Sequence, residues 1–487
     1  MLARFIGRLD PALPWLPRLF VLVALPSVLA MALLFPLGEG PDEASQTARA
    51  ASVLRGQWIG RRVQLPHPAD GLPVSVAGVD INPGYLLPFL TLPSLPLEAR
   101  KPVTLDAVQA SAASRWPKDP VFIVASNTAS YLPLFYLPAA AGMGMAALVR
   151  AGPMETVLAG RVANALSCVL AGYLVLRLAR RGRPALFALL VLPMTLHLAA
   201  TINQDGPLIA TAALAAALLP QAGRRYWVGV AALACVVGAK PPYLPLAAAA
   251  LVPLNGMAWQ ARRHGTACLI VVAAGLAWAV AAAVFAAVPF LRAPYHPGPL
   301  WPGPDLLFRT TDPAAQFQVL LHRPALFLRL PLDTLTVGWR YLARTAVGVF
   351  ASLDFDLPAW FYRVWYAALA TSTLAAAAVA AGGGAKPSTP RLPASLTLAM
   401  AAAFCFVGLI LLQYLTWSDV GHATVDGVQG RYLLPVLAIL VPALPALRLP
   451  APADGAARTV LSVPAVAAGL LGLGVLPVLI VLRYYLR

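Results

Sequence analysis

The chain has 487 residues, of which 60% are hydrophobic and only 11% are charged, and its mean hydropathy is +0.74. Soluble globular proteins carry about 25% charged residues, so this composition excludes an ordinary soluble domain. Apolar runs of about twenty residues, each long enough to cross a bilayer, recur along the chain. The sequence therefore predicts an all-α polytopic membrane protein in which residues 1–487 form a single integral membrane domain.

The formal net charge is +17. The arginines occur in short clusters between apolar runs, a distribution that orients membrane helices and is not typical of nucleic-acid binding. We therefore expect the lipid bilayer as a partner and no nucleic acid. The cysteines form no CxxC pair and lie inside apolar runs, so neither a disulfide nor a zinc site is predicted for Cys168, Cys235, Cys268 and Cys405.

The first apolar run, Leu16 to Leu37, follows Arg4 and Arg8 and is longer than the core of a cleaved signal peptide. It predicts an uncleaved first helix with a cytoplasmic N-terminus. Residues 39–154 then form a large first periplasmic loop, whose polar part contains many prolines and charges of both signs.

Charge also places the segments that follow. The apolar run Tyr131 to Val149 can be a span or a juxtamembrane helix. As a span it would leave the densest basic cluster, RLARRGRP at 177–184, on the outer side, so we expect a helix at the periplasmic interface. The run Thr156 to Leu176 is then the second span.

Continued along the chain, this alternation predicts about eleven spans and a second large periplasmic loop at 292–358. The run that contains Lys240 can be one helix or two. Pro241 and Pro242 interrupt helical hydrogen bonding, and two short helices keep the basic cluster at 261–265 inside. We therefore expect a break at Lys240.

Under this topology, the unusual polar residues collect at the periplasmic ends of the helices. The set includes Asp42, Glu43, Asn127, Asn203, Asp205, Lys240, Gln429 and Arg431. Arg161 lies in the second span near its outer end, where a buried polar group needs a partner. The grouping predicts a working site at the outer membrane face.

The adjacent carboxylates Asp42 and Glu43 have two interpretations. After Pro41 they can cap the next helix, whose positive end attracts acids. Alternatively, one of them deprotonates a hydroxyl nucleophile while the other orients the hydroxyl or holds a divalent metal cofactor such as Mg or Mn. Which acid would be the base stays open.

The other candidates also have simpler explanations. Lys240 and Arg431 can neutralise a phosphate, or they can anchor helices at the membrane interface. Asn203 and Asp205, in TINQDGP, suit a tight turn as well as a site. The chain contains no HExxH, GxSxG, P-loop or dinucleotide-binding motif, so nucleotide-driven chemistry is not predicted.

Six segments carry a family resemblance and occur in the order GPDEASQTARAASVLRGQW, NTASYLPLFYLPAAAG, GRVANAL, LPMTLHLAATINQDG, AKPPYLPL and GVQGRYLLPVLA. Together, from about Pro41 to Pro435, they resemble the bacterial membrane family called domain of unknown function 2142. That family is grouped by similarity with the GT-C glycosyltransferases, which are polytopic helical enzymes.

The resemblance implies a GT-C-like bundle in the bacterial inner membrane, with its active site facing the periplasm. It implies transfer of a sugar from a polyprenyl-phosphate donor to an envelope glycan or lipid acceptor. Asp42 and Glu43 match the family's acidic position, Arg161 resembles the arginine of the following span, and 131–149 matches a juxtamembrane helix. We expect substrate binding by Arg161, Asn127, Asn203, Asp205, Lys240, Gln429 and Arg431.

Two other classes of function stay open. A transporter or flippase of lipid-linked saccharides would also need polar groups in the membrane. Transporters usually place such groups near the midplane and show inverted repeats, and this sequence shows no clear repeat. A structural subunit of an envelope-biosynthesis complex would tolerate neutralisation of Asp42, Lys240 and Arg431.

Overall fold

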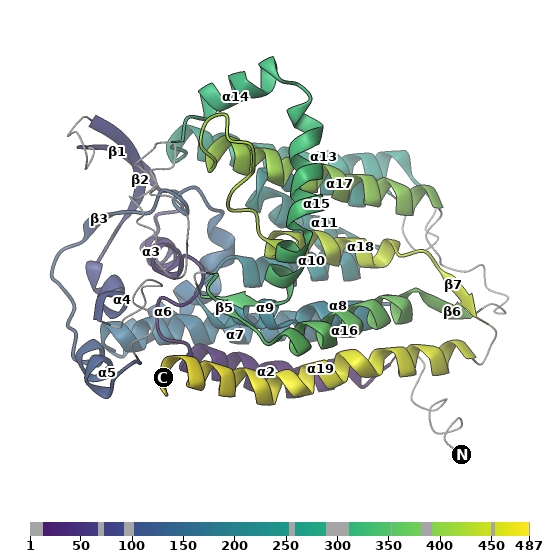
Figure 1. Ribbon diagram of the computed structural model, residues 1–487, viewed down its shortest axis with the longest axis horizontal. Helices are drawn as coiled ribbons and strands as arrows, with labels where there is room; N and C mark the ends of the chain where they lie inside the picture. The colour runs from purple at the N-terminus through teal and green to yellow at the C-terminus, as the bar shows by residue number, and fades with distance from the viewer. Residues whose placement is uncertain are drawn as a thin grey trace.

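The computed structural model describes residues 13–66, 73–91, 102–252, 259–288, 311–351, 353–380, 392–449 and 453–486. Most of these residues are helical. Figure 1 shows α2 (Leu16–Leu34), α7 (Pro153–Leu178), α16 (Ala359–Ala377) and α19 (Ala453–Tyr484) lying roughly along the long axis of the molecule, and α2 packs against both α7 and α19.

Five of the described helices are long and apolar enough to cross a membrane: α2 (Leu16–Leu34), α7 (Pro153–Leu178), α13 (Ala261–Phe285), α17 (Leu392–Thr416) and α19 (Ala453–Tyr484). The helices α8 (Arg183–Leu190) and α9 (Pro193–Ala200) meet at a bend of 55° and together supply a sixth candidate. The protein is therefore a mostly helical, multi-pass membrane protein.

The expected number of about eleven spans is larger than this count. Several runs that the sequence presented as spans form shorter helices, such as α10 (Asp205–Leu218) and α11 (Arg224–Ala239), and α16 (Ala359–Ala377) is also outside the set. The 14-residue α10 is about 21 Å long, too short for a hydrocarbon core of about 30 Å. The alternation of the basic clusters, and not helix length, was the reason for counting such short runs as spans.

The predicted break at Lys240 is confirmed. Helix α11 ends at Ala239, and the chain continues as the 3₁₀ helix η3 (Pro241–Ala247) and the short α12 (Ala248–Leu251). Lys240 itself is extended, with φ −144° and ψ 121°, as expected for a residue that precedes proline.

The first loop contains a sheet that the all-α prediction missed. Strands β1 (Arg61–Pro66), β2 (Pro73–Ile81) and β3 (Val121–Val124) pair antiparallel in the order β1-β2-β3, with Val79 opposite Ile123. The segment PVSVAGVDI is rich in β-branched residues, which favour strands. Figure 1 shows this sheet at one end of the molecule, near α3.

Short helices complete this loop: α3 (Glu43–Leu54), η1 (Pro83–Leu86), α4 (Leu87–Thr91), α5 (Leu105–Ala112), η2 (Pro133–Tyr136) and α6 (Leu137–Leu148). The apolar stretch formed by η2 and α6 is shorter than a membrane span. This length agrees with the expectation that 131–149 does not cross the membrane. Helix α6 instead packs against α3 and α7.

Of the expected second loop, 292–310 lies outside the described residues. The described part contains α14 (Pro313–His322), α15 (Leu326–Val347) and the pair β4 (Val349–Phe350) and β5 (Phe355–Asp356). Strands β6 (Ala378–Ala380) and β7 (Leu447–Leu449) pair in parallel, away from the first sheet (Figure 1).

Helix α15 crosses the bundle steeply in Figure 1 and packs against η4 (Gly430–Leu433). A Cβ atom at Gly430 would lie 1.9 Å from the Leu342 carbonyl oxygen, so glycine is required for this close approach. The Gly430 N–H donates to Thr345 Oγ1 at 2.8 Å. The chain then continues through α18 (Leu434–Leu440) and η5 (Val441–Ala443), and α15 thus fixes the start of this segment.

Candidate functional site

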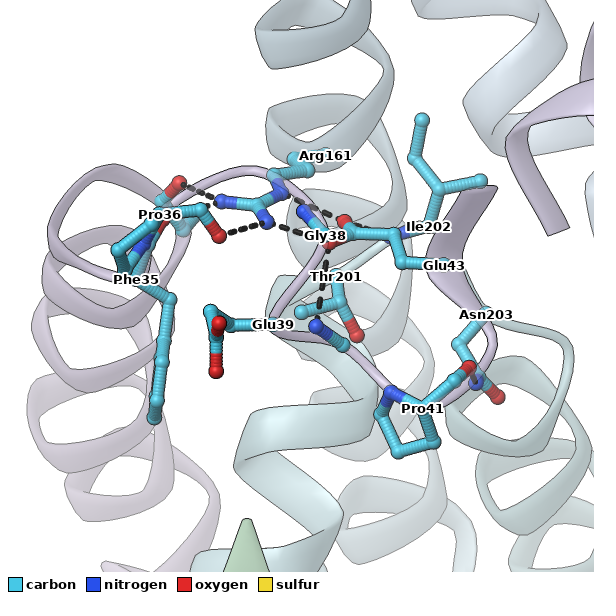
Figure 2. A network of polar contacts seen from close by, with 12 residues as sticks. Phe35, Pro36, Gly38, Glu39, Pro41, Glu43, Arg161, Thr201, Ile202 and Asn203 are labelled. Carbon is cyan, nitrogen blue, oxygen red and sulfur yellow. Dashed lines mark hydrogen bonds and ion pairs between the residues drawn. The ribbon is translucent and has the colours of Figure 1, made fainter. Parts of the chain in front are cut away.

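The loop between α2 and α3 is held by a fully buried ion pair. Arg161, on α7, donates from Nε to Glu43 Oε1 at 2.6 Å and from Nη2 to Glu43 Oε2 at 2.5 Å. Both side chains are 0% exposed. Figure 2 shows the guanidinium facing the carboxylate across the loop. A bidentate pair of this kind is among the stronger and more directional polar contacts in proteins.

The other polar atoms of this pair are also engaged. Arg161 donates to carbonyl oxygens at the end of α2, those of Ala32, Phe35 and Pro36. Glu43 accepts backbone N–H groups of Gly38, Gly40 and Ile202. This geometry favours a structural role for Glu43 and Arg161 over the catalytic and substrate-binding roles expected from the sequence.

Asp42 is arranged quite differently from Glu43. Its side chain is exposed, and it makes no hydrogen bond or ion pair with any residue that the structure describes. Asp42 occupies the N-cap position of α3, yet its carboxylate does not accept a capping hydrogen bond there. Its backbone is left-handed, with φ 54° and ψ 27°, a conformation that Asp tolerates better than most residues. The Asp42 carboxylate therefore remains available to a substrate.

Two cations converge on Asp205, the first residue of α10. Lys240 Nζ lies 2.9 Å from Asp205 Oδ1, and Arg431 Nε lies 3.8 Å from Asp205 Oδ2. The side chains of Asp205, Lys240 and Arg431 are 8%, 14% and 6% exposed. We call these three residues the Asp205 cluster. Because two cations share one carboxylate, the cluster carries an excess positive charge in a poorly solvated place.

Asn203 connects the Asp205 cluster to the loop that carries Asp42. Its amide nitrogen donates to the Pro41 carbonyl oxygen at 3.1 Å, and its Oδ1 accepts the Asp205 N–H at 2.7 Å. Asn203 is buried. The structure thus brings Asp42, Asn203, Asp205, Lys240 and Arg431 into one neighbourhood, as their shared predicted side of the membrane suggested.

Tyr432 forms an aromatic wall beside both cations. Lys240 Nζ lies 4.3 Å and Arg431 Cζ 5.3 Å from the centre of its ring. Such contacts stabilise cations by electrostatic attraction to the ring face. The hydroxyl of Tyr243 donates to the Tyr432 carbonyl oxygen at 2.6 Å, which fixes the backbone of this wall.

Sequence reasoning missed Tyr131 and Arg49. Burial is the main cause that raises the pKa of the Tyr131 phenol, and the nearby charges of Asp42 and Asp205 raise it further, so Tyr131 belongs to the same neighbourhood. Buried Arg49, on α3, donates from Nη2 to the Tyr131 carbonyl oxygen at 2.9 Å. An arginine among small residues in EASQTARAASVL was the available signal for this anchor.

The remaining candidates, Asn127 and Gln429, make fewer contacts in the described structure. Asn127 is half-buried in the turn that follows β3, and none of its described contacts joins it to the Asp205 cluster. Gln429 lies directly before η4, and its buried Oε1 atom has no hydrogen-bond partner among the described residues. Gln429 therefore stays a binding candidate by position, whereas Asn127 has no geometric support.

The Asp205 cluster has unused hydrogen-bond donors. Nε and Nη1 of Arg431 are buried and have no hydrogen-bond partner in the described structure, since the 3.8 Å contact to Asp205 exceeds hydrogen-bonding distance. Buried donors normally have partners, so an anion such as phosphate fits this place.

A metal site is less well supported by the side chains. Nowhere in the described ranges do three or more His, Cys, Asp or Glu side chains group so that they could hold a metal ion. A Mg or Mn ion at Asp42 would therefore take its other ligands from substrate phosphates and water, which is a usual arrangement for Mg.

A second acid of the same loop, Glu39, was also missed. Glu39 is buried and accepts a hydrogen bond from the Tyr484 hydroxyl at 2.6 Å. Figure 2 shows it on the other side of the loop from the Glu43–Arg161 contact. Burial raises the pKa of Glu39 to about 7; the Tyr484 hydrogen bond and Arg483 oppose this, while Asp354 and Glu43 add to it.

The buried ion pair predicts that substitutions of the neighbouring acids Glu43 and Asp42 have very different effects on stability. Glu43→Gln leaves the buried Arg161 charge without its counter-charge, which should cost about 3–5 kcal/mol and lower the melting temperature in detergent. Asp42→Asn should leave that temperature nearly unchanged, because the Asp42 carboxylate has no partner among the residues that the structure describes. Equal melting temperatures for wild type and Glu43→Gln would contradict a structural role for the pair.

Glu39 predicts a pH dependence of stability. Because its pKa rises from 4.5 to about 7 on folding, the folded protein holds a proton that the unfolded chain releases between these values. Stability from Glu39 is thus complete below pH 4.5 and falls by up to roughly 3 kcal/mol as the pH rises through 7. Glu39→Gln should remove this component from melting curves at pH 5 to 8; an unchanged pH slope would refute the assignment.

The chain was also compared with known proteins. A family model described as "Predicted membrane protein (DUF2142)" matches residues 25–440. Neither a curated protein nor a solved structure matches the chain. The matched segment includes Asp42, the Glu43–Arg161 pair and the whole Asp205 cluster. Because the family model covers most of the sequence, the chain belongs to the DUF2142 family of predicted membrane proteins.

Proposed function

We propose that this protein is a GT-C-like glycosyltransferase that moves a sugar from a polyprenyl-phosphate donor to an envelope glycan or lipid acceptor. The observation that carries the proposal is the proximity of Asp42, whose carboxylate has no partner among the described residues, to the cationic Asp205 cluster. Acid and cations come from separate parts of the chain and are linked through Asn203. The GT-C relationship itself rests on the sequence resemblance.

The Asp205 cluster would bind the donor phosphate. Arg431 offers the unpartnered Nε and Nη1 donors, and Lys240 adds a second positive charge beside Tyr432. Asp205 holds both cations in place before the substrate arrives, which lowers the cost of ordering them. An arginine suits this task because its planar guanidinium can donate to two phosphate oxygens at once.

The reaction follows from charge and proton balance. Asp42 accepts the proton of an acceptor hydroxyl, whose oxygen forms a bond to the anomeric carbon while the bond from that carbon to the phosphate oxygen breaks. The electron pair leaves with the polyprenyl phosphate, whose charge becomes more negative. Attack opposite the leaving group inverts the anomeric centre. Positioned cations therefore stabilise the transition state more than the donor itself.

The proposal places this reaction at the periplasmic face of the bacterial inner membrane. The support is the distribution of charge: the arginine-rich segment 177–184 covers the end of α7 and the start of α8, whereas the Glu43–Arg161 pair lies toward the start of α7. Basic loops tend to remain cytoplasmic, which would leave Asp42 on the outer side. Tyr131, whose carbonyl oxygen accepts from Arg49, would then lie in the same neighbourhood as Asp42.

The test compares surface-glycan composition in a deletion strain complemented with wild type, Asp42→Asn or Asp106→Asn. Asp106 is an exposed acid of α5 in the same loop and serves as the matched control. Loss of a general base typically slows transfer about 10²–10⁴-fold, so Asp42→Asn at equal protein level should leave one sugar missing. Wild type and Asp106→Asn should restore it.

Full restoration by Asp42→Asn would overturn the assignment of the base. Accumulation of the complete lipid-linked saccharide on the cytoplasmic side in the deletion strain would point instead to a flippase. An intact glycan when Asp42, Lys240 and Arg431 are all neutralised would point to a structural subunit.

A further inference from the structure

A second unsatisfied cation lies in the turn between α7 and α8. Arg181 is half-buried there, and its Nη2 donates to the Leu444 carbonyl oxygen at 2.7 Å, just before β7. Its Nε and Nη1 atoms are buried and have no hydrogen-bond partner among the residues the structure describes. Unpaired buried donors are rare in folded proteins, so these atoms need an explanation.

Arg181 also lacks a counter-charge. It forms no ion pair with a carboxylate of the described ranges, and burial alone lowers the pKa of its guanidinium, with no charged neighbour as a cause. An arginine that only anchors a helix end keeps its charged head in water. Arg181 instead has part of its head group buried, and among the described residues only the Leu444 carbonyl oxygen compensates for this, through Nη2.

The backbone holds Arg181 in this position. Gly182 has φ 77°, and a Cβ atom there would lie 2.2 Å from Val441 Cγ1, so the turn sits tightly against η5. Gly182 is also the N-cap of α8, whose eight residues direct their positive end toward the turn. Other arginines are close in the sequence or at the same helix end: Arg177 and Arg180 are exposed, and Gln221 accepts from Arg225 and donates to the Leu178 carbonyl oxygen at the end of α7.

This place is distinct from the Asp205 cluster. Arg161, which pairs with Glu43, and Leu178, the last residue of α7, are separated by about 25 Å of helix. In Figure 1 the end of the bundle next to β7 lies away from the sheet and α3. A ligand held by Arg181 would therefore not be the substrate bound near Asp42.

We propose that Arg181 is the centre of a binding site for the phosphate of an anionic phospholipid, formed by the α7–α8 turn, η5 and the start of α8. A phosphate oxygen would accept from Nε and Nη1, and the surrounding arginines would add long-range attraction. Basic pockets between membrane helices are known to hold anionic head groups. The lipid would connect α7, α8 and η5 at the end opposite to the proposed transfer site.

The test uses the full-length protein in phosphatidylcholine nanodiscs titrated with dioleoyl-phosphatidylglycerol, with bound lipid counted by native mass spectrometry and stability followed by melting temperature. Arg181→Gln should bind phosphatidylglycerol about tenfold more weakly than wild type. Arg180→Gln, which removes an exposed neighbouring charge, should bind nearly as wild type. Arg181→Lys keeps the charge but not the paired donors and should be intermediate.

Equal phosphatidylglycerol binding by wild type and Arg181→Gln would overturn the proposal, as would an equal loss in Arg180→Gln. If Arg181→Gln does not fold, Arg181→Lys decides, and wild-type affinity in that variant counts against the site. A parallel titration with inorganic phosphate distinguishes a phospholipid head group from free phosphate as the ligand. Protection by phosphate alone that depends on Arg181 would retain the anion site but overturn the phospholipid as its ligand.

Discussion

The arrangement at the candidate site depends on the buried contact between Arg161 and Glu43. Arg161 uses its guanidinium to join the end of α2, the start of α3 and its own helix α7, and Glu43 also accepts the Ile202 N–H before α10. A charge pair with no solvent exposure is stable only when its remaining donors and acceptors are satisfied, as they are here. This contact fixes the loop in which the neighbouring Asp42 side chain is exposed and has no hydrogen-bond or ion-pair partner among the described residues.

The segment 201–205 connects this loop to the two cations. Asn203 bonds to the Asp42 loop and to the N–H of Asp205, and Asp205 holds Lys240 and Arg431. Lys240 is placed by the helix break before Pro241, and the segment that carries Arg431 is placed by the close approach of Gly430 to α15. Breaks and short helices, which reduce the number of spans, are therefore the features that bring the polar groups together.

The sequence predicted the membrane class, the break at Lys240 and the grouping of Asp42, Asp205, Lys240 and Arg431, because these follow from hydropathy, proline chemistry and arginine clusters. It could not separate Asp42 from Glu43, since the difference depends on which carboxylate meets Arg161 in three dimensions. The sequence did not indicate the roles of Glu39, Tyr131 and Arg49 for the same reason, because their partners are distant in sequence. The number of spans was overestimated because short apolar runs, such as the one that forms the 14-residue α10, were counted as spans.

The most direct test of the account measures binding of undecaprenyl phosphate to the purified protein in nanodiscs. The account predicts specific binding by wild type. Binding by Arg431→Gln should be about tenfold or more weaker, because the phosphate would lose the Nε and Nη1 donors of Arg431, which have no partner among the described residues. Arg115→Gln, a change to an exposed arginine of the first loop, should bind as wild type. Wild-type affinity in Arg431→Gln, or an equal loss in Arg115→Gln, would contradict the assignment of the Asp205 cluster as the lipid-phosphate site.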